Sequence, residues 1–469
     1  MNPVTRTKKP LWLRVLRFLI FAVVALFLLA LVVRLTWGFV SARQMRHELA
    51  RIQAAGEPLT FDELDAASSP VSEAGDAAPH YVAALALLEQ VSDFSEVMMT
   101  YHDAAKDWPI QQPDVPARDQ LRQILVEAQP VLELLDKAAA TETCRYDLGA
   151  GHGIQTVIER LGPPRSAARL LGLRSLDLAF GKQPEAAVDS VISILKMQRI
   201  TERHPVLIAH LVRISIDALA CQTAVIVLEL SDPSDASLAG LQQSLLSADE
   251  PDRLTRCLVA ERVFGILLHR NIITGSAGMP STTEDGSSPA PQLFSGFWGR
   301  PVFESMAVGY LRDMATAIHA SRNPPPQVYD HVSGMTAESL QGAIIIPALR
   351  QAVLTDGQGL AIARCTRGAV MIERFRLAHG ELPQSLSDLI PTFADALPSD
   401  PFTGQALQYR VDENSYVVYS VGDDRHDDGG QIEEQGQLKR SDWGVRVRSM
   451  GKGAPQETTR GSAANSQPG

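Results

Sequence analysis

The feature that most constrains this chain is an apolar run near its amino terminus, at residues 18–33, in which no side chain is polar. A helix needs about 20 apolar residues to cross the hydrocarbon layer of a bilayer, and apolar neighbours on both sides extend this run to residues 11–40. Trp12 and Trp37 fall near its two ends, where amphipathic rings favour the membrane interface. The sequence therefore predicts a transmembrane signal anchor at 11–40.

Basic residues decide how such an anchor is oriented, because positively charged flanks stay in the cytoplasm. We expect residues 1–10 to form a cytoplasmic tail. The protein would then be single-pass in the cytoplasmic (inner) membrane, with the bulk of the chain on the periplasmic side. The basic residues on the amino-terminal side are Arg6, Lys8, Lys9, Arg14 and Arg17, against Arg34, Arg43, Arg46 and Arg51 on the other side.

A cleaved signal peptide is the alternative interpretation of the same segment. Such a peptide also has a basic start, an apolar run and small residues at its cleavage site, which Val40, Ser41 and Ala42 could supply. The apolar run is long for a signal peptide, and the bulky Trp37 and Phe39 lie close to that site. Retention of the anchor is favoured, and cleavage after Ala42 stays open.

The charge balance and the cysteines exclude several classes of function. The 469 residues carry a formal net charge of −11, whereas phosphate backbones are bound by clustered Lys and Arg, so nucleic acid is not an expected partner. The chain contains no C-x-x-C pair, so neither a zinc ribbon nor a thioredoxin-like site is expected. Two cysteines could pair in an oxidising compartment, but helical surroundings favour buried free thiols. The cysteines are Cys144, Cys221, Cys257 and Cys365.

Hydrophobic spacing divides most of the remaining chain into helical segments. Val188, Ile192 and Leu195, for example, recur at the spacing of one buried helical stripe, and short turns between such stripes indicate antiparallel helical hairpins. The expected order is juxtamembrane helices and a linker at 41–116, a helical-hairpin domain at 117–275, a loop-rich segment with one helix at 276–335, and a long helix at 336–380.

The last part of the chain changes from a helical to an alternating pattern. Residues 406–411 and 416–421 alternate between two faces and are rich in aromatic and β-branched side chains, so we expect an antiparallel hairpin, to which 444–448 could add a third strand. The predicted fold is mainly α: an N-terminal transmembrane helix, the helical-hairpin domain, and a small α+β lobe at 381–449. A disordered tail is expected at 450–469.

Part of this lobe resembles a known family. Residues 397–409 read L-P-S-D-P-F-T-G-Q-A-L-Q-Y, and this segment is similar to the L-P-x-D-P-W-G-x-P-Y-x-Y segment of type II secretion major pseudopilins. Residues 419–424 read Y-S-V-G-D-D, which resembles the S-x-G-A-D-G turn of that family. The wider arrangement of anchor, helical middle and pilin-like ending is similar to membrane proteins of planctomycete-type bacteria, to which no activity is attached.

The loop after the second expected strand is acidic. Four of the six residues 423–428 are aspartates, whose carboxylates repel one another unless solvent or a cation relieves the charge. Carboxylates along a glycine-bearing loop suit Ca²⁺. Pseudopilins bind calcium in this loop, and the resemblance implies Ser420, Asp423 and Asp442 as ligands. Asp427 joins them as a carboxylate of the same loop. A solvated acidic loop without an ion is the alternative.

No sequence motif for catalysis or nucleotide binding is present. The chain lacks H-E-x-x-H, G-x-S-x-G and Walker sequences. His204 and His210 have no acidic partners at ligand spacing, so we expect satisfied or exposed histidines rather than a metal site.

These observations favour a non-enzymatic envelope protein. It would be anchored in the lipid bilayer and would present its helical domain to an envelope protein partner, with no small-molecule substrate indicated. One alternative is an envelope hydrolase whose site is assembled from distant residues. The other is an accessory component of a type II secretion-like system.

Overall fold

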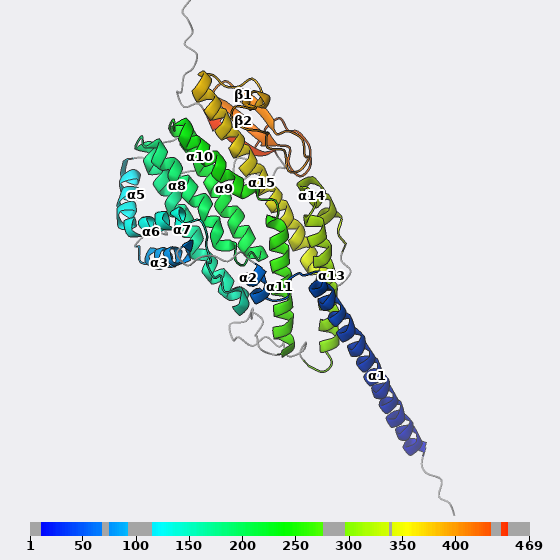
Figure 1. The fold of residues 1–469 in the computed structure, drawn as a ribbon. Coiled ribbons are helices and arrows are strands. Elements are labelled where there is room, and N and C mark those ends of the chain that lie inside the picture. The colour runs from blue at the N-terminus through cyan, green and yellow to red at the C-terminus, as the bar shows by residue number, and fades with distance from the viewer. Residues whose placement is uncertain are drawn as a thin grey trace, which may run out of the picture.

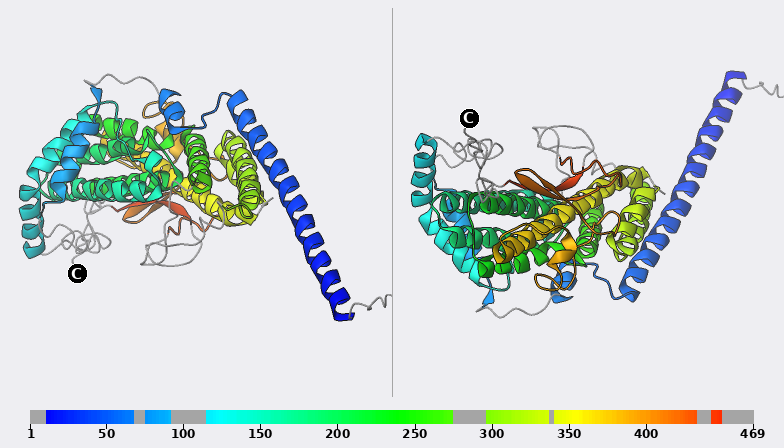
Figure 2. Two further views of the ribbon diagram at one scale, coloured as in Figure 1. Left: turned by 90° about the horizontal axis from the view of Figure 1, so that it is seen from below. Right: turned by 90° about the horizontal axis from the view of Figure 1, so that it is seen from above.

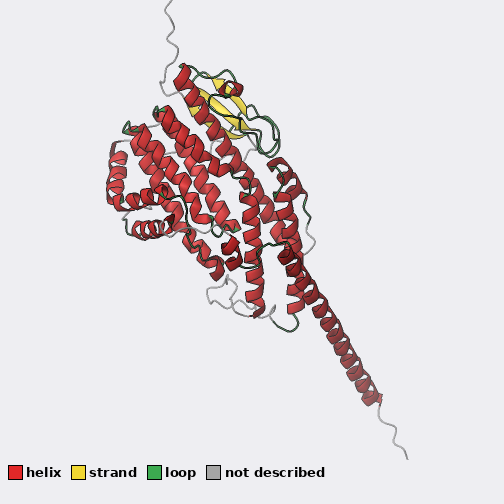
Figure 3. Ribbon diagram, viewed as in Figure 1, coloured by secondary structure: helices red, strands yellow, loops and turns green. Residues whose placement is uncertain are grey.

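The computed structural model describes residues 11–67, 75–91, 115–274, 296–336, 340–432 and 442–448. This part is mainly helical, and its sheet lies at the end of the molecule opposite to the projecting N-terminal helix (Figure 3). The predicted mainly α fold with a small α+β lobe near the carboxyl end is confirmed. The tails expected at 1–10 and 450–469 lie outside the described residues.

The longest helix, α1 (Leu11–Ala54), begins in the apolar run and continues past it without interruption. Its first part stands apart from the rest of the molecule, with Phe18 and Phe21 more than 70% exposed (Figures 1 and 2). By length and composition this helix can cross a membrane. The anchor and the juxtamembrane helix expected after it are therefore one rod.

A second helix, α9 (Leu207–Leu230), is also long and apolar, but 67% of its apolar window is buried inside the protein. It is the central helix of a stack in which α7 contacts α8 and both contact α9 (Figure 1). Prolines in the first turn begin several of these helices, since an amide there has no intrahelical partner. The helices are α2 (Phe61–Ala67), α3 (Ala78–Leu88), α5 (Val115–Glu127), α6 (Gln129–Ala140), α7 (Ile154–Phe180), α8 (Pro184–Met197), α10 (Asp235–Leu245) and α11 (Arg253–Thr274), with 3-10 turns η2 (Ala150–His152), η3 (Gln198–Thr201) and η4 (Leu246–Asp249).

The segment 276–335 was expected to hold one helix, and that prediction is wrong. Its described part holds two, α13 (Arg300–Ser321) and α14 (Pro325–Gly334). Residues 323–326 read N-P-P-P, a run that commonly breaks a helix, yet Pro325 begins α14, because proline fits the first helical turn. The long helix α15 (Leu340–His379) follows and stays helical through Pro347.

The sheet has the order β1-β2-β3, with both pairs antiparallel. The expected hairpin is confirmed, and the third strand is present as well. The Tyr416 hydroxyl donates to Glu373 Oε1 at 3.0 Å, and Val418 is fully buried, so the sheet is joined to α15 by both polar and apolar contacts. The strands are β1 (Gln408–Asp412), β2 (Ser415–Ser420) and β3 (Trp443–Arg448), preceded by the 3-10 turn η5 (Leu386–Leu389).

All four cysteines are buried and unpaired. Cys144, Cys221, Cys257 and Cys365 are at most 8% exposed, and burial raises the pKa of each thiol. The expectation of buried free thiols is confirmed. They act as small apolar side chains of the helical core.

A glycine on α11 allows α13 to approach closely. A Cβ at Gly265 would lie 2.3 Å from Cε1 of Tyr310, whose hydroxyl is held by the Glu261 carbonyl at 2.9 Å. We expect Gly265→Ala to lower the free energy of unfolding by about 1–3 kcal/mol, because the ring has no free space into which to move. Denaturant titration of the full-length protein in detergent measures the loss.

Gly334→Ala is the matched control. Gly334 is exposed at the end of α14, and a Cβ there meets nothing within 4 Å. Because alanine favours a helix over glycine, the control should raise the free energy of unfolding by up to about 1 kcal/mol. Equal effects of the two substitutions would contradict the close approach of α11 and α13.

Candidate functional site

α1 packs against α13, and the two helices run parallel. The Ser41 hydroxyl donates to Glu304 Oε2 at 3.3 Å, and Arg312 Nε donates to Glu48 Oε1 at 2.9 Å. The two pairs are 263 and 264 residues apart, so successive turns of α1 meet successive turns of α13. Ser41, Glu48 and Glu304 are at most 7% exposed, and buried hydrogen bonds of this kind hold the helix pair in one register.

The last turns of α1 belong to the core of the protein. Met45 and Ile52 are buried in one apolar cluster with residues of α11, α13, α14 and α15. Just past the helix, Glu57 accepts hydrogen bonds at 2.5 Å from Arg262 and at 2.5 Å from Arg322. Partial burial would raise the pKa of Glu57, but these two guanidinium groups outweigh it and leave that pKa below its usual range. The last turns of α1 are thus fixed to the rest of the domain by apolar packing and by ion pairs.

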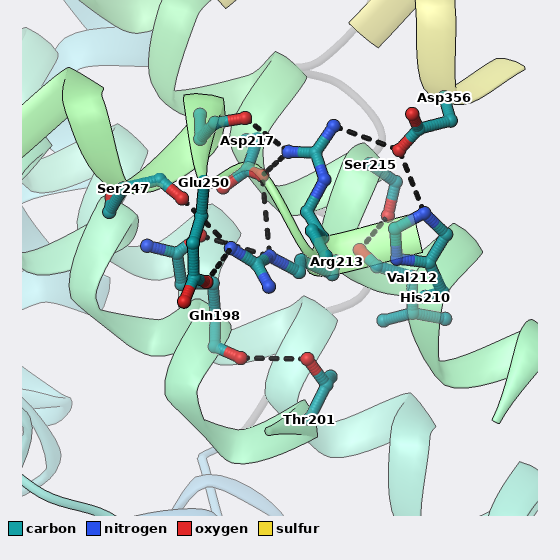
Figure 4. Close-up of polar contacts among 12 residues, drawn as sticks. Gln198, Thr201, His210, Val212, Arg213, Ser215, Asp217, Ser247, Glu250 and Asp356 are labelled. Carbon is teal, nitrogen blue, oxygen red and sulfur yellow. Dashed lines mark hydrogen bonds and ion pairs between the residues drawn. The ribbon is translucent and has the colours of Figure 1, made fainter. Parts of the chain in front are cut away.

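A second polar cluster lies deep in the helical domain, where α9, α11 and α15 meet (Figure 4). Within the largely apolar α9, His210, Arg213 and Asp217 are spaced by three and four residues, which places them on one face. Arg253 comes from α11 and Asp356 from α15. All five side chains belong to residues that are at most 5% exposed.

Asp356 is the centre of this cluster. Its Oδ1 lies 2.9 Å from His210 Nε2 and accepts a hydrogen bond from Arg253 Nη2 at 2.8 Å. Burial disfavours the charge of Asp356, but the attraction of Arg253 and the hydrogen bond from His210 outweigh it and lower its pKa. Burial lowers the pKa of His210, so a neutral imidazole donates its Nε2 proton to the carboxylate.

Asp217 is the poorly satisfied member of the cluster. It lies 3.9 Å from Arg213 Nε and 4.0 Å from Arg253 Nη1, too far for a hydrogen bond, and its oxygens accept none within the described part of the chain. Burial raises its pKa to about 6. Arg213 instead donates to Gln198 Oε1 at 3.1 Å and to the Ser247 carbonyl at 2.9 Å.

This charge cluster joins helices instead of facing a ligand. His210 is 1% exposed and Asp356 is 5% exposed, so neither side chain offers a surface that a substrate could reach. The expectation of a satisfied histidine is confirmed for His210. His204 is also buried, with Nε2 3.2 Å from Asp65, but neither of its ring nitrogens makes a hydrogen bond within the described residues. Sequence reasoning missed Asp356 because it lies 146 residues from His210. The signal that could have revealed the cluster is the polar stripe of His210, Arg213 and Asp217 on the largely apolar α9.

Arg253→Met leaves the buried Asp356 without its cation. We expect the free energy of unfolding to fall by about 3–5 kcal/mol in a denaturant titration of the full-length protein, because an uncompensated buried charge is costly. The double variant Arg253→Met/Asp356→Leu removes both charges and should recover most of that loss.

The control is Arg256→Met, one turn along α11. Arg256 pairs with Glu250 at the surface and its side chain is 48% exposed, so we expect a loss of at most about 1 kcal/mol. A loss for Arg253→Met no larger than that of the control would show that the cluster contributes little to stability.

The predicted calcium loop lies between β2 and β3. The carboxylate of Asp442 is buried and accepts the backbone N–H of Gly430 at 2.7 Å and of Asp428 at 3.3 Å, while Asp427 accepts the Tyr419 hydroxyl at 3.1 Å. Burial raises the pKa of Asp442, and the negative charges of Asp427 and Asp428 raise it further. The two backbone hydrogen bonds lower this pKa but do not outweigh the other effects. A cation bound here would relieve that repulsion.

The other two predicted ligands are placed differently from each other. Ser420 is buried and its hydroxyl accepts the N–H of Gly422 at 3.2 Å, whereas Asp423 is exposed. Among the residues with described positions, no group of three or more His, Cys, Asp or Glu side chains is arranged to hold a metal ion. Residues 433–441 of the loop lie outside the described chain. Calcium binding by this loop stays a prediction.

That prediction has a direct test. Chelator should lower the melting temperature of the purified protein, and added Ca²⁺ should restore it, because an ion bound only by the folded loop stabilises the fold. Asp423→Ala should abolish the restoration, whereas the control Asp395→Ala, exposed before β1, should keep it. A melting temperature that chelator leaves unchanged would identify a solvated acidic loop without an ion.

The described structure defines a class: a mainly helical protein whose N-terminal helix is long and apolar enough to span a membrane and is built into the core of the folded domain. Comparison with known proteins adds no family to this description, since neither a family model nor a curated protein nor a solved structure matches the chain.

Proposed function

We propose that this chain is a non-enzymatic, single-pass protein of the cytoplasmic membrane, which holds its helical domain and pilin-like lobe rigidly on the extracytoplasmic side. The observation that carries the proposal is the continuity of α1, whose apolar part is exposed and whose last turns are buried in the domain core. A domain attached in this way has a fixed orientation to the bilayer. Such an arrangement suits a protein that presents one surface to an envelope partner.

The same contacts support retention of the anchor. Cleavage after Ala42 would remove Ser41, whose hydroxyl bonds to Glu304, and would cut α1 in the middle of its contact with α13. The mature chain would keep Met45 and Ile52 but would lose the preceding turns of α1, including those at Gly38 and Ser41 that contact α13. The uncleaved form is therefore the one that we propose.

The two alternatives have less support. A hydrolase would need His210 and Asp356 to meet a substrate, and both are buried in a cluster whose charges are directed at one another. A role beside a type II secretion-like system rests on the resemblance of residues 397–424 alone. A calcium ion in the loop of Asp423 and Asp442 would be structural in all three cases.

Protease protection tests the topology. Protease added to intact spheroplasts should digest the chain beyond α1 and leave a membrane-bound fragment that begins at the native amino terminus, because the domain is outside and the tail is inside. A cytoplasmic marker protein must stay intact as the control. A domain digested only after lysis, or a mature chain that begins at Arg43, would contradict the proposal.

A further inference from the structure

The contact between α1 and α13 extends to the point where the apolar run ends. A Cβ added at Gly38 would lie 3.5 Å from Pro301 Cγ, so Pro301 packs close to α1 at this position, one turn before the Ser41–Glu304 hydrogen bond. Arg34 lies one further turn toward the membrane, and its guanidinium group stacks on the Phe297 ring with 4.3 Å between Cζ and the ring centroid. Arg34 also donates to the Phe297 carbonyl. All these pairs share the same sequence offset, so the level of Phe297 along α1 is fixed.

That level is the surface of the bilayer, if α1 crosses the membrane as proposed above. The apolar run ends at Val33, and Arg34 is the first charged side chain after it. An arginine at the end of a spanning helix places its guanidinium among the lipid headgroups. The ring that this guanidinium group covers must then lie at the same depth.

Phe297 and Trp298 form an exposed aromatic pair at this position. Their ring centroids are 5.4 Å apart, and Phe297 is 52% exposed and Trp298 is 53% exposed. Outside α1, no other phenylalanine or tryptophan in the described ranges is classed as exposed. Two solvated aromatic rings side by side are unfavourable in water, whereas the bilayer interface favours such rings.

We infer that Phe297 and Trp298 insert into the lipid interface as a second membrane contact beside α1. The occupant of this patch is lipid because the patch continues the membrane-spanning face of α1, with Trp37 on the same helix 44% exposed one turn beyond Arg34. These two membrane contacts, α1 and the Phe297–Trp298 pair, fix both the height and the tilt of the domain relative to the bilayer. The inference rests on the proposed spanning of α1.

Tryptophan quenching by brominated lipid tests the contact. The full-length protein is placed in phosphatidylcholine nanodiscs with or without bromine on the acyl chains near the headgroup. The emission of Trp298 is obtained as the difference between the wild type and Trp298→Phe, and that of Trp37 from Trp37→Phe. Both substitutions keep an aromatic ring, so the fold should be preserved. We expect bromine to lower the Trp298 emission by about half or more, as for an indole at the interface.

The outcomes separate the two proposals. Quenching of Trp37 without quenching of Trp298 would overturn this inference and leave the membrane anchor intact. Absence of quenching at both positions would overturn the anchor itself. A Trp298 that is shielded from both brominated lipid and aqueous iodide would indicate a protein on the patch and would also overturn the inference.

Discussion

The pairing of α1 with α13 is the contact on which the rest of the structure depends. The hydrogen bond from Ser41 to Glu304 is buried and the one from Arg312 to Glu48 is partly buried, and each joins a turn of α1 to a turn of α13. A flexible linker after the apolar run would leave the orientation of the domain free. A continuous helix with its last turns in the core instead gives the projecting apolar part of α1 a fixed direction relative to the rest of the molecule.

Two further contacts extend that rigidity to the far end. Arg253 and Asp356 join α11 to α15 in a buried ion pair that includes His210 of α9. The carboxyl-terminal half of α15 packs against the sheet, and there the Tyr416 hydroxyl donates a hydrogen bond to Glu373. Buried charge pairs add little net stability over apolar packing, but a misaligned pair is costly, so they favour one arrangement of the helices. The C-terminal α+β lobe therefore has a defined place relative to α1.

The sequence predicted what local patterns encode. The apolar run, the helical hairpins and the β1–β2 hairpin each follow from the periodicity of neighbouring residues. The second helix of 276–335 was missed because proline was read as a break, although Pro325 lies where a helix accepts it. The partners of Ser41 and His210 lie 263 and 146 residues away, and no local spacing reveals them. The contacts that join α1 to the domain were therefore beyond sequence reasoning, whereas the apolar run of α1 was predicted.

Hydrogen–deuterium exchange of the full-length protein in lipid nanodiscs tests the central claim most directly. If α1 is one rod from the bilayer into the core, the amides of residues 34–54 should exchange slowly and without a gap, as slowly as those of α13. Rapid exchange confined to residues 38–42 would reveal a hinge between anchor and domain, and would contradict this account.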